Sequence, residues 1–139
     1  FFLVFITSFL FLFLMAGMAS AAKNDFGLGV YDSHGLCLSA KFGLSPEISA
    51  QGLFSSDYVG LRGLYDLAKA PNYNFFGFGE FGFIFNDKVA VGLGVGAEFF
   101  VFKALNVKEL ASLGFALDIG LDILPSTGFA IGGGFHYYF

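Results

Sequence analysis

Residues 110–124 read LASLGFALDIGLDIL, and this stretch decides the fold class. Its odd-numbered positions from Ala111 to Ile123 are all apolar, whereas its even-numbered positions from Ser112 to Asp122 are small or acidic. Successive side chains of a β-strand point to opposite faces, so this alternation predicts a strand with one apolar and one polar face. A helix would instead repeat its apolar positions every three to four residues.

Two further segments, 89–99 and 129–139, repeat the same alternation. Their odd-numbered residues are mainly large and apolar, and their even-numbered residues are mostly glycine and alanine, with Glu98 and His136 among the exceptions. An eight-stranded barrel has an interior only just wide enough for side chains, so small inward residues fit it. The pattern therefore favours strands with an apolar outer face and a small or polar inner face.

The composition indicates a membrane protein. The chain of 139 residues is 56% hydrophobic and only 13% charged, against roughly 25% in soluble domains. The longest charge-free stretch of the later part, 123–139, contains Pro125 and several glycines, which do not suit a helix. Backbone groups in lipid must pair internally, so the remaining solution is a closed antiparallel up-and-down barrel. The net charge of −4 argues against a nucleic-acid partner.

Turn residues divide the chain into eight expected strands, an even number that suits a single-chain bacterial barrel. Clear breaks are Ser45-Pro46, Asn86-Asp87 and 125–128. The segment near residue 80 has the least regular alternation, because an inward Glu80 leaves two glycines facing outward. A bulge or a shifted register would account for this. The expected strands are 26–31, 36–43, 47–54, 57–67, 74–85, 88–101, 109–123 and 128–139.

Residues 1–21 are expected to form a helical signal peptide, and residues 22–139 the barrel domain. The leader is uncharged and ends in small residues at Ala19 and Ala21, which predicts cleavage after Ala21. Because no methionine or basic segment precedes the leader, we expect the natural chain to begin upstream. The alternative is a permanent membrane anchor, since about 20 apolar residues can span a bilayer.

The C-terminus is the most specific local feature. Phe135, Tyr137 and Phe139 alternate to the terminal residue, and this resembles the signal that outer-membrane proteins present to the barrel-assembly machinery. Segments 121–128 and 132–139 resemble the last hairpin of a family of small, uncharacterised outer-membrane barrels, and 35–41 resembles its second strand. The resemblance covers about 26–139 and implies the OmpA-type eight-stranded architecture in a Gram-negative outer membrane. It implies no activity, because fold does not define function.

Charged residues within the expected strands should point into the lumen, because a charge at the lipid midplane costs about 2–4 kcal/mol for Arg or Lys. The expected lumen charges comprise five carboxylates and only two cations. Unpaired buried carboxylates cost free energy unless they are hydrated or protonated. We expect a salt-bridge network that plugs the lumen; a narrow ion path or a small-ligand site is the alternative. The expected lumen charges are Lys41, Arg62, Asp66, Glu80, Glu98, Asp118 and Asp122.

A third possibility is an enzyme that modifies lipid A, with Ser126, His34 and Asp32 as candidate residues at the outer rim. Sequence order alone gives no triad geometry, so we expect no catalytic activity. Cys37 and His136 are interpreted as interior packing residues. No metal-ligand spacing or cofactor motif is present, so neither a metal nor a cofactor is expected.

With the mature N-terminus in the periplasm, the outward loops 32–35, 55–57, 86–87 and 124–128 would all be short. Short loops argue against an adhesin or a receptor, which must present surface. We therefore expect a monomeric outer-membrane barrel, porin-like in architecture, with a structural or membrane-organising role. Its expected partners are the outer-membrane lipid and, during biogenesis, the assembly machinery.

Overall fold

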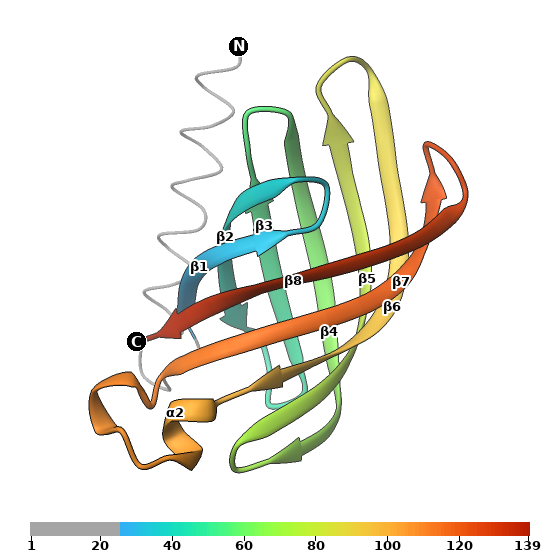
Figure 1. Cartoon of the computed structure of the whole chain (residues 1–139). Helices are drawn as coiled ribbons and strands as arrows, with labels where there is room; N and C mark the ends of the chain where they lie inside the picture. The colour runs from blue at the N-terminus through green and yellow to red at the C-terminus, as the bar shows by residue number, and fades with distance from the viewer. Residues whose placement is uncertain (1–25) are drawn as a thin grey trace.

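The computed structural model describes residues 26–139, and these form a closed antiparallel barrel in which each strand pairs with the next and β8 pairs with β1 (Figure 1). The predicted eight-stranded all-β barrel is thereby confirmed. Its strands are β1 (Phe26–Asp32), β2 (Leu36–Gly43), β3 (Ile48–Phe54), β4 (Tyr58–Ala70), β5 (Tyr73–Ile84), β6 (Lys88–Phe99), β7 (Leu113–Leu124) and β8 (Gly128–Tyr138).

The two ends of the barrel differ in their connections. One end, called here the tip end, carries the short turns 33–35, 55–57, 85–87 and 125–127. The other end, called the α2 end, carries the turns 44–47 and 71–72, the long segment 100–112, the start of β1 and the end of β8. Segment 100–112 contains the short helix α2 (Val101–Ala104) and the 3-10 turn η2 (Lys108–Leu110).

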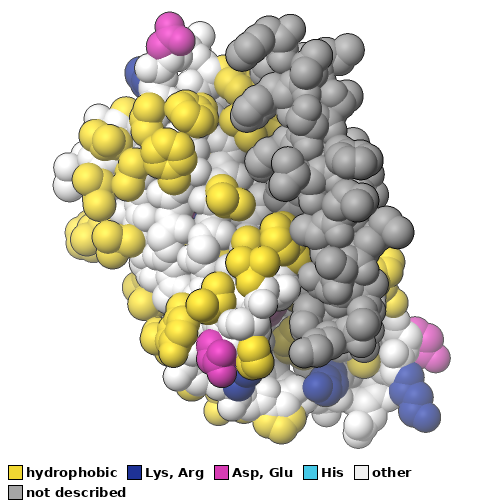
Figure 2. Space-filling view, turned by 180° about the vertical axis from the view of Figure 1, so that it is seen from behind, with side chains coloured by type: hydrophobic (Ala, Val, Ile, Leu, Met, Phe, Trp, Pro, Cys, Tyr) yellow, Lys and Arg dark blue, Asp and Glu magenta, His cyan; other side chains and the backbone are white. Residues whose placement is uncertain are grey.

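Alternation sorts the side chains into two environments. On β7, Leu117 and Ile119 are more than 60% exposed on the outer face, whereas Ala116 and Asp118 are 5% exposed inside. On the face seen in Figure 2, acidic and basic side chains gather near the two ends, and apolar side chains lie between them. Within residues 26–139, the helices are too short and too polar for any of them to cross a bilayer.

Glycines on the inner face provide the space for large interior side chains. A Cβ atom added to Gly60 or Gly82 would collide with the buried Tyr58 ring, and one added to Gly96 would lie 2.5 Å from Phe76. Gly60 and Gly82 are direct partners on β4 and β5 and make room for Tyr58, whereas Gly96 on β6 lies opposite Phe76 and makes room for that ring. The interior is therefore filled by side chains, as expected for a barrel of this size.

Three local expectations differ from the structure, and a fourth lies outside the described residues. The expected strand 109–123 begins only at Leu113, because η2 and a turn occupy the preceding residues, and β6 ends at Phe99 where α2 follows. β5 itself alternates without interruption; the register shift lies opposite it, between Asp66 and Ala68 of β4. The expected signal peptide 1–21, with Ala19 and Ala21, lies outside the described residues.

Candidate functional site

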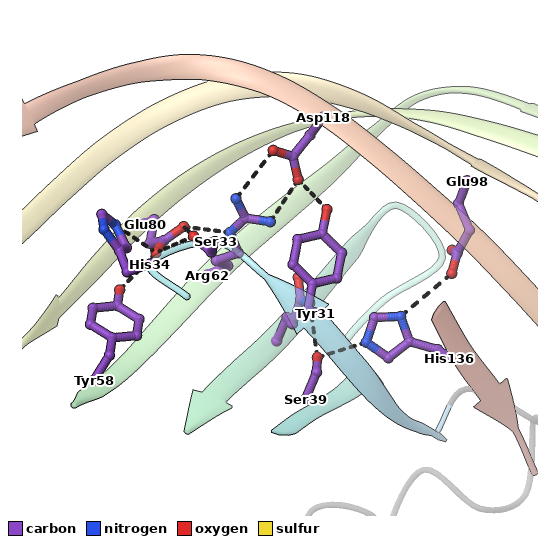
Figure 3. A network of polar contacts seen from close by, with 11 residues as sticks. Tyr31, Ser33, His34, Ser39, Tyr58, Arg62, Glu80, Glu98, Asp118 and His136 are labelled. Atoms are coloured by element: carbon purple, nitrogen blue, oxygen red, sulfur yellow. Dashed lines mark hydrogen bonds and ion pairs between the residues drawn. The ribbon is translucent and has the colours of Figure 1, made fainter. Parts of the chain in front are cut away.

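A buried arginine organises the middle of the lumen (Figure 3). Arg62 on β4 is 2% exposed; its Nε donates to Glu80 Oε2 on β5 at 2.6 Å, and its Nη1 donates to Asp118 Oδ2 on β7 at 2.9 Å. Its guanidinium lies 4.0 Å from the ring centroid of Phe78 and 5.0 Å from that of Tyr31. Arg62 therefore links strands on different sides of the barrel through charge-assisted bonds and aromatic contacts.

Hydroxyl groups complete the shell of the two carboxylates. Tyr58 Oη donates to Glu80 Oε1 at 2.7 Å, Ser33 Oγ donates to the same oxygen at 3.0 Å, and Tyr31 Oη donates to Asp118 Oδ2. These donors come from β1, β4 and the first turn, so residues distant in sequence share one network. A buried carboxylate with both a cation and hydroxyl donors avoids the cost of an unsatisfied charge.

His34, in the turn between β1 and β2, closes this network at the tip end. Its Nε2 lies 3.4 Å from Glu80 Oε1, and its ring centroid lies 4.8 Å from that of Tyr58. Hydrogen bonding to the Glu80 carboxylate raises the pKa of His34, although its partial burial opposes this. Because Arg62 faces two carboxylates, protonation of His34 would bring a second positive charge to the cluster.

A second cluster surrounds Glu98 toward the α2 end. Glu98 is 1% exposed; its Oε2 accepts from Lys41 Nζ at 2.9 Å, and its Oε1 accepts from Tyr138 Oη at 2.6 Å. The Lys41 ammonium also lies 5.7 Å from the ring centroids of Phe76 and Tyr138. The Lys41 ammonium thus contacts a carboxylate and two aromatic rings inside the barrel.

Ser39, His136 and Glu98 lie in the order of a hydrolase triad. Ser39 Oγ is 2.7 Å from His136 Nε2, and His136 Nδ1 is 3.8 Å from Glu98 Oε1 (Figure 3). However, Ser39 is only 3% exposed and lines neither of the two cavities described below, so no substrate could reach it. Gln51 Nε2 also donates to Ser39 Oγ at 2.9 Å, which fits a packed polar core rather than a nucleophile.

Two cavities of very different size reach the clusters. The larger, about 300 Å³, opens at the α2 end and is lined by Lys41, Glu98 and Tyr138 together with residues of the turns. The smaller, about 10 Å³, lies beside Arg62, Glu80 and Asp118 and has room for about one water molecule. Between them the rings of Phe76, Phe78 and Tyr31 occupy the interior, and Tyr31 stacks on His136 at 5.9 Å.

Five of the seven predicted lumen charges take part in the two clusters. Asp66 instead pairs with Lys69 at 3.2 Å near the α2 end. Asp122 is half-buried beside the smaller cavity, and within residues 26–139 no hydrogen bond or ion pair is found for its side chain. The acidic surplus inside the barrel is therefore smaller than the residue count implied, because Asp66 pairs with Lys69. Tyrosine hydroxyls satisfy the oxygens of Glu80, Glu98 and Asp118 without changing the charge.

The candidate rim enzyme residues are not brought together. His34 contacts Glu80 and Tyr58, whereas Ser126 and Asp32 are exposed, and no hydrogen bond within residues 26–139 joins any two of the three. Cys37 is buried, with its Sγ 3.3 Å from the Gly35 carbonyl oxygen. Within the same residues, no group of three histidine, cysteine or acidic side chains could hold a metal ion.

The predicted assembly residues Phe135, Tyr137 and Phe139 lie on the outer face of β8 and its end, 40–58% exposed. Sequence reasoning gave no role to Tyr31, Tyr58 or Tyr138, which are central to the network. The alternation of side chains along each strand could have identified them. Tyr31, for example, is odd-numbered like Gly27 and Gly29, and odd-numbered residues of β1 point to the inner face.

Comparisons with known proteins gave no match to any family model, curated protein or solved structure. The fold and the site define an up-and-down β-barrel with an apolar outer wall and a charged, largely filled lumen.

Proposed function

We propose that the protein is an integral outer-membrane β-barrel with a plugged lumen and a structural or membrane-organising role. The observation that carries the proposal is the reversed distribution of polarity. Arg62 and Glu98 are at most 2% exposed inside the barrel, whereas Phe129 and Ile131 are 94% and 79% exposed outside. Such a wall is costly in water but suits lipid, and a closed barrel leaves no unpaired strand edge.

The plugged lumen supports a structural role over a pore. An ion crossing the barrel would have to separate Arg62 from Glu80 and Asp118, which are bonded at 2.6 and 2.9 Å, and pass the aromatic layer. Breaking a buried pair costs about 3–5 kcal/mol. The short turns at the tip end also leave little surface for binding a large partner, in agreement with a scaffold in the membrane.

The resemblance of the C-terminal segment to known outer-membrane barrels supports the same proposal. Outward Phe135, Tyr137 and Phe139 are free to contact an assembly factor before they contact lipid. We infer a monomer that reaches the outer membrane by means of the leader 1–21. With the N-terminus in the periplasm, the α2 end and its long segment 100–112 are periplasmic, whereas small barrels usually place their longer loops outside.

Expression with a signal peptide in a Gram-negative host tests the proposal. We expect the protein in the outer-membrane fraction, resistant to carbonate extraction, with a faster gel mobility before boiling than after it. The mature N-terminus should begin at residue 22. In planar bilayers, the purified barrel should show no steady conductance. Recovery in the soluble fraction would contradict the membrane proposal, and steady conductance would replace the plugged barrel by a pore.

A further inference from the structure

The cavity of about 300 Å³ at the α2 end differs in character from the rest of the lumen. It is open to solvent, and its volume falls at the lower limit of small-molecule sites. Its floor is the Lys41–Glu98–Tyr138 cluster, which the bonds at 2.9 and 2.6 Å hold in place. A preformed floor of this kind lowers the entropic cost of binding a ligand.

The charges around this cavity leave one cation without a partner. Lys41 pairs with Glu98 at 2.9 Å and Lys69 pairs with Asp66 at 3.2 Å, so two of the three lysines are neutralised. The third, Lys103 in α2, is exposed at the mouth, and no ion pair is found for it within residues 26–139. The cavity therefore carries a positive surplus in a chain whose net charge is −4.

The neutral polar groups of the wall can act as donors. Ser49 and Ser112 line the cavity with hydroxyl groups, and the amide of Asn74 lies on the same wall. The two acidic residues accept from lysine side chains, and the Glu98 carboxylate is 1% exposed. A ligand would thus meet ammonium, hydroxyl and amide donors but few free carboxylate oxygens.

We propose that this cavity binds a phosphate group. Lysine acts on phosphate as a point charge and can approach a tetrahedral oxyanion from different walls, whereas planar carboxylates are matched better by arginine forks. Lys103 supplies the unpaired charge at the mouth, and the serine hydroxyls supply neutral donors. The phosphate can belong to free phosphate or to the headgroup of an anionic lipid, since the mouth lies at the edge of the apolar outer wall, beside the 45% exposed Val101.

The test uses the whole barrel, folded in dodecyl maltoside micelles, which contain no phosphate. Inorganic phosphate is titrated at low ionic strength, and binding is followed by calorimetry and by amide NMR shifts of α2. We expect saturable binding that Lys103→Gln weakens about five-fold, because an exposed ion pair contributes at most about that factor. Lys108→Gln is the matched control: it removes the same charge at the same end but does not line the cavity, so it should leave binding unchanged.

A second titration distinguishes the two sources of phosphate. Competition by short-chain phosphatidylglycerol assigns the site to a lipid headgroup, and binding without such competition assigns it to free phosphate. Absence of saturable binding, or equal losses in Lys103→Gln and Lys108→Gln, would overturn the proposal. The experiment is independent of the cellular location of the barrel, so its failure would leave the membrane proposal intact.

Discussion

Arg62 and Glu80 are directly paired residues of β4 and β5, and Arg62 Nε lies 2.6 Å from Glu80 Oε2. The same guanidinium reaches Asp118 on β7, a strand that is not adjacent to β4. One side chain therefore joins a neighbouring strand to the opposite wall of the barrel. This relationship makes Arg62 the residue on which the filled lumen depends most.

Replacing Arg62 with methionine should destabilise the barrel by about 3–5 kcal/mol, because Glu80 and Asp118 would remain buried without a cation. The chain contains no tryptophan, so urea unfolding in micelles is best followed by gel mobility and circular dichroism. The triple variant Arg62→Met, Glu80→Gln, Asp118→Asn removes the unpaired charges and should recover part of the loss. A loss below 1 kcal/mol for Arg62→Met alone would contradict a central role for Arg62.

The alternation of residues 111–123, repeated in 89–99 and 129–139, predicted strands with one outward face, and with the low charge content it predicted the closed barrel. The alternation also placed Asp118 on the inner face, and that of residues 89–99 placed Glu98 there, where both side chains lie. The identity of their partners was not predictable, because partners come from strands distant in sequence. Tyr31 bonds Asp118 across the lumen, and no local pattern encodes that pairing.

The connection between β6 and β7 was the least predictable part of the fold. Segment 100–112 shows no sustained alternation of apolar and polar residues, and none of the residues of its short helix α2 is buried. Its position at the mouth of the cavity depends on where the two long strands end. The candidate phosphate site contains Lys103 from this segment, and could therefore be found only after the barrel was known.

Protonation of His34 should stabilise the barrel. The groups that face His34 are Glu80, Asp122 and Arg62, and the Tyr58 ring packs on it. The raised pKa of His34 in the folded state means that its contribution is fully present below about pH 6.5, the usual value, and is lost as the pH rises through the folded-state pKa. Because the side chain is partly exposed, the effect should not exceed about 1 kcal/mol.

Free energies of unfolding measured at pH 5.5 and pH 8.5 test this expectation. The wild-type barrel should lose stability between the two, and His34→Gln should show a smaller loss over the same interval. The comparison isolates His34 because the two proteins are identical at every other position. An equal pH dependence in the two proteins would show that Glu80 does not stabilise a charged His34.

Gly82 on the inner face of β5 should tolerate no side chain, whereas Gly79 on the outer face of the same strand should. Gly82→Ala would bring a Cβ atom against the buried Tyr58 ring and a backbone carbonyl, and overpacking of this kind costs about 1–3 kcal/mol. Gly79→Ala on the same strand is the matched control, because nothing lies within 4 Å of its Cβ position. Urea unfolding of both variants gives the comparison. Similar stabilities for the two variants would mean that the interior is looser than described.

A charge on the outer face should be costly only at the depth of the lipid core, if the barrel lies in a membrane. Ile119 is at the middle of β7 and is 61% exposed, and Ile123 lies on the same face beside the tip end. In lipid, Ile119→Arg should cost about 2–4 kcal/mol, whereas Ile123→Arg near the interface should cost about 0–1 kcal/mol. Refolding both variants into phosphatidylcholine vesicles measures the difference. A barrel whose outer wall faces water would instead accept either arginine with little change in its free energy of unfolding. Equal stabilities of the two variants would therefore argue against the membrane proposal.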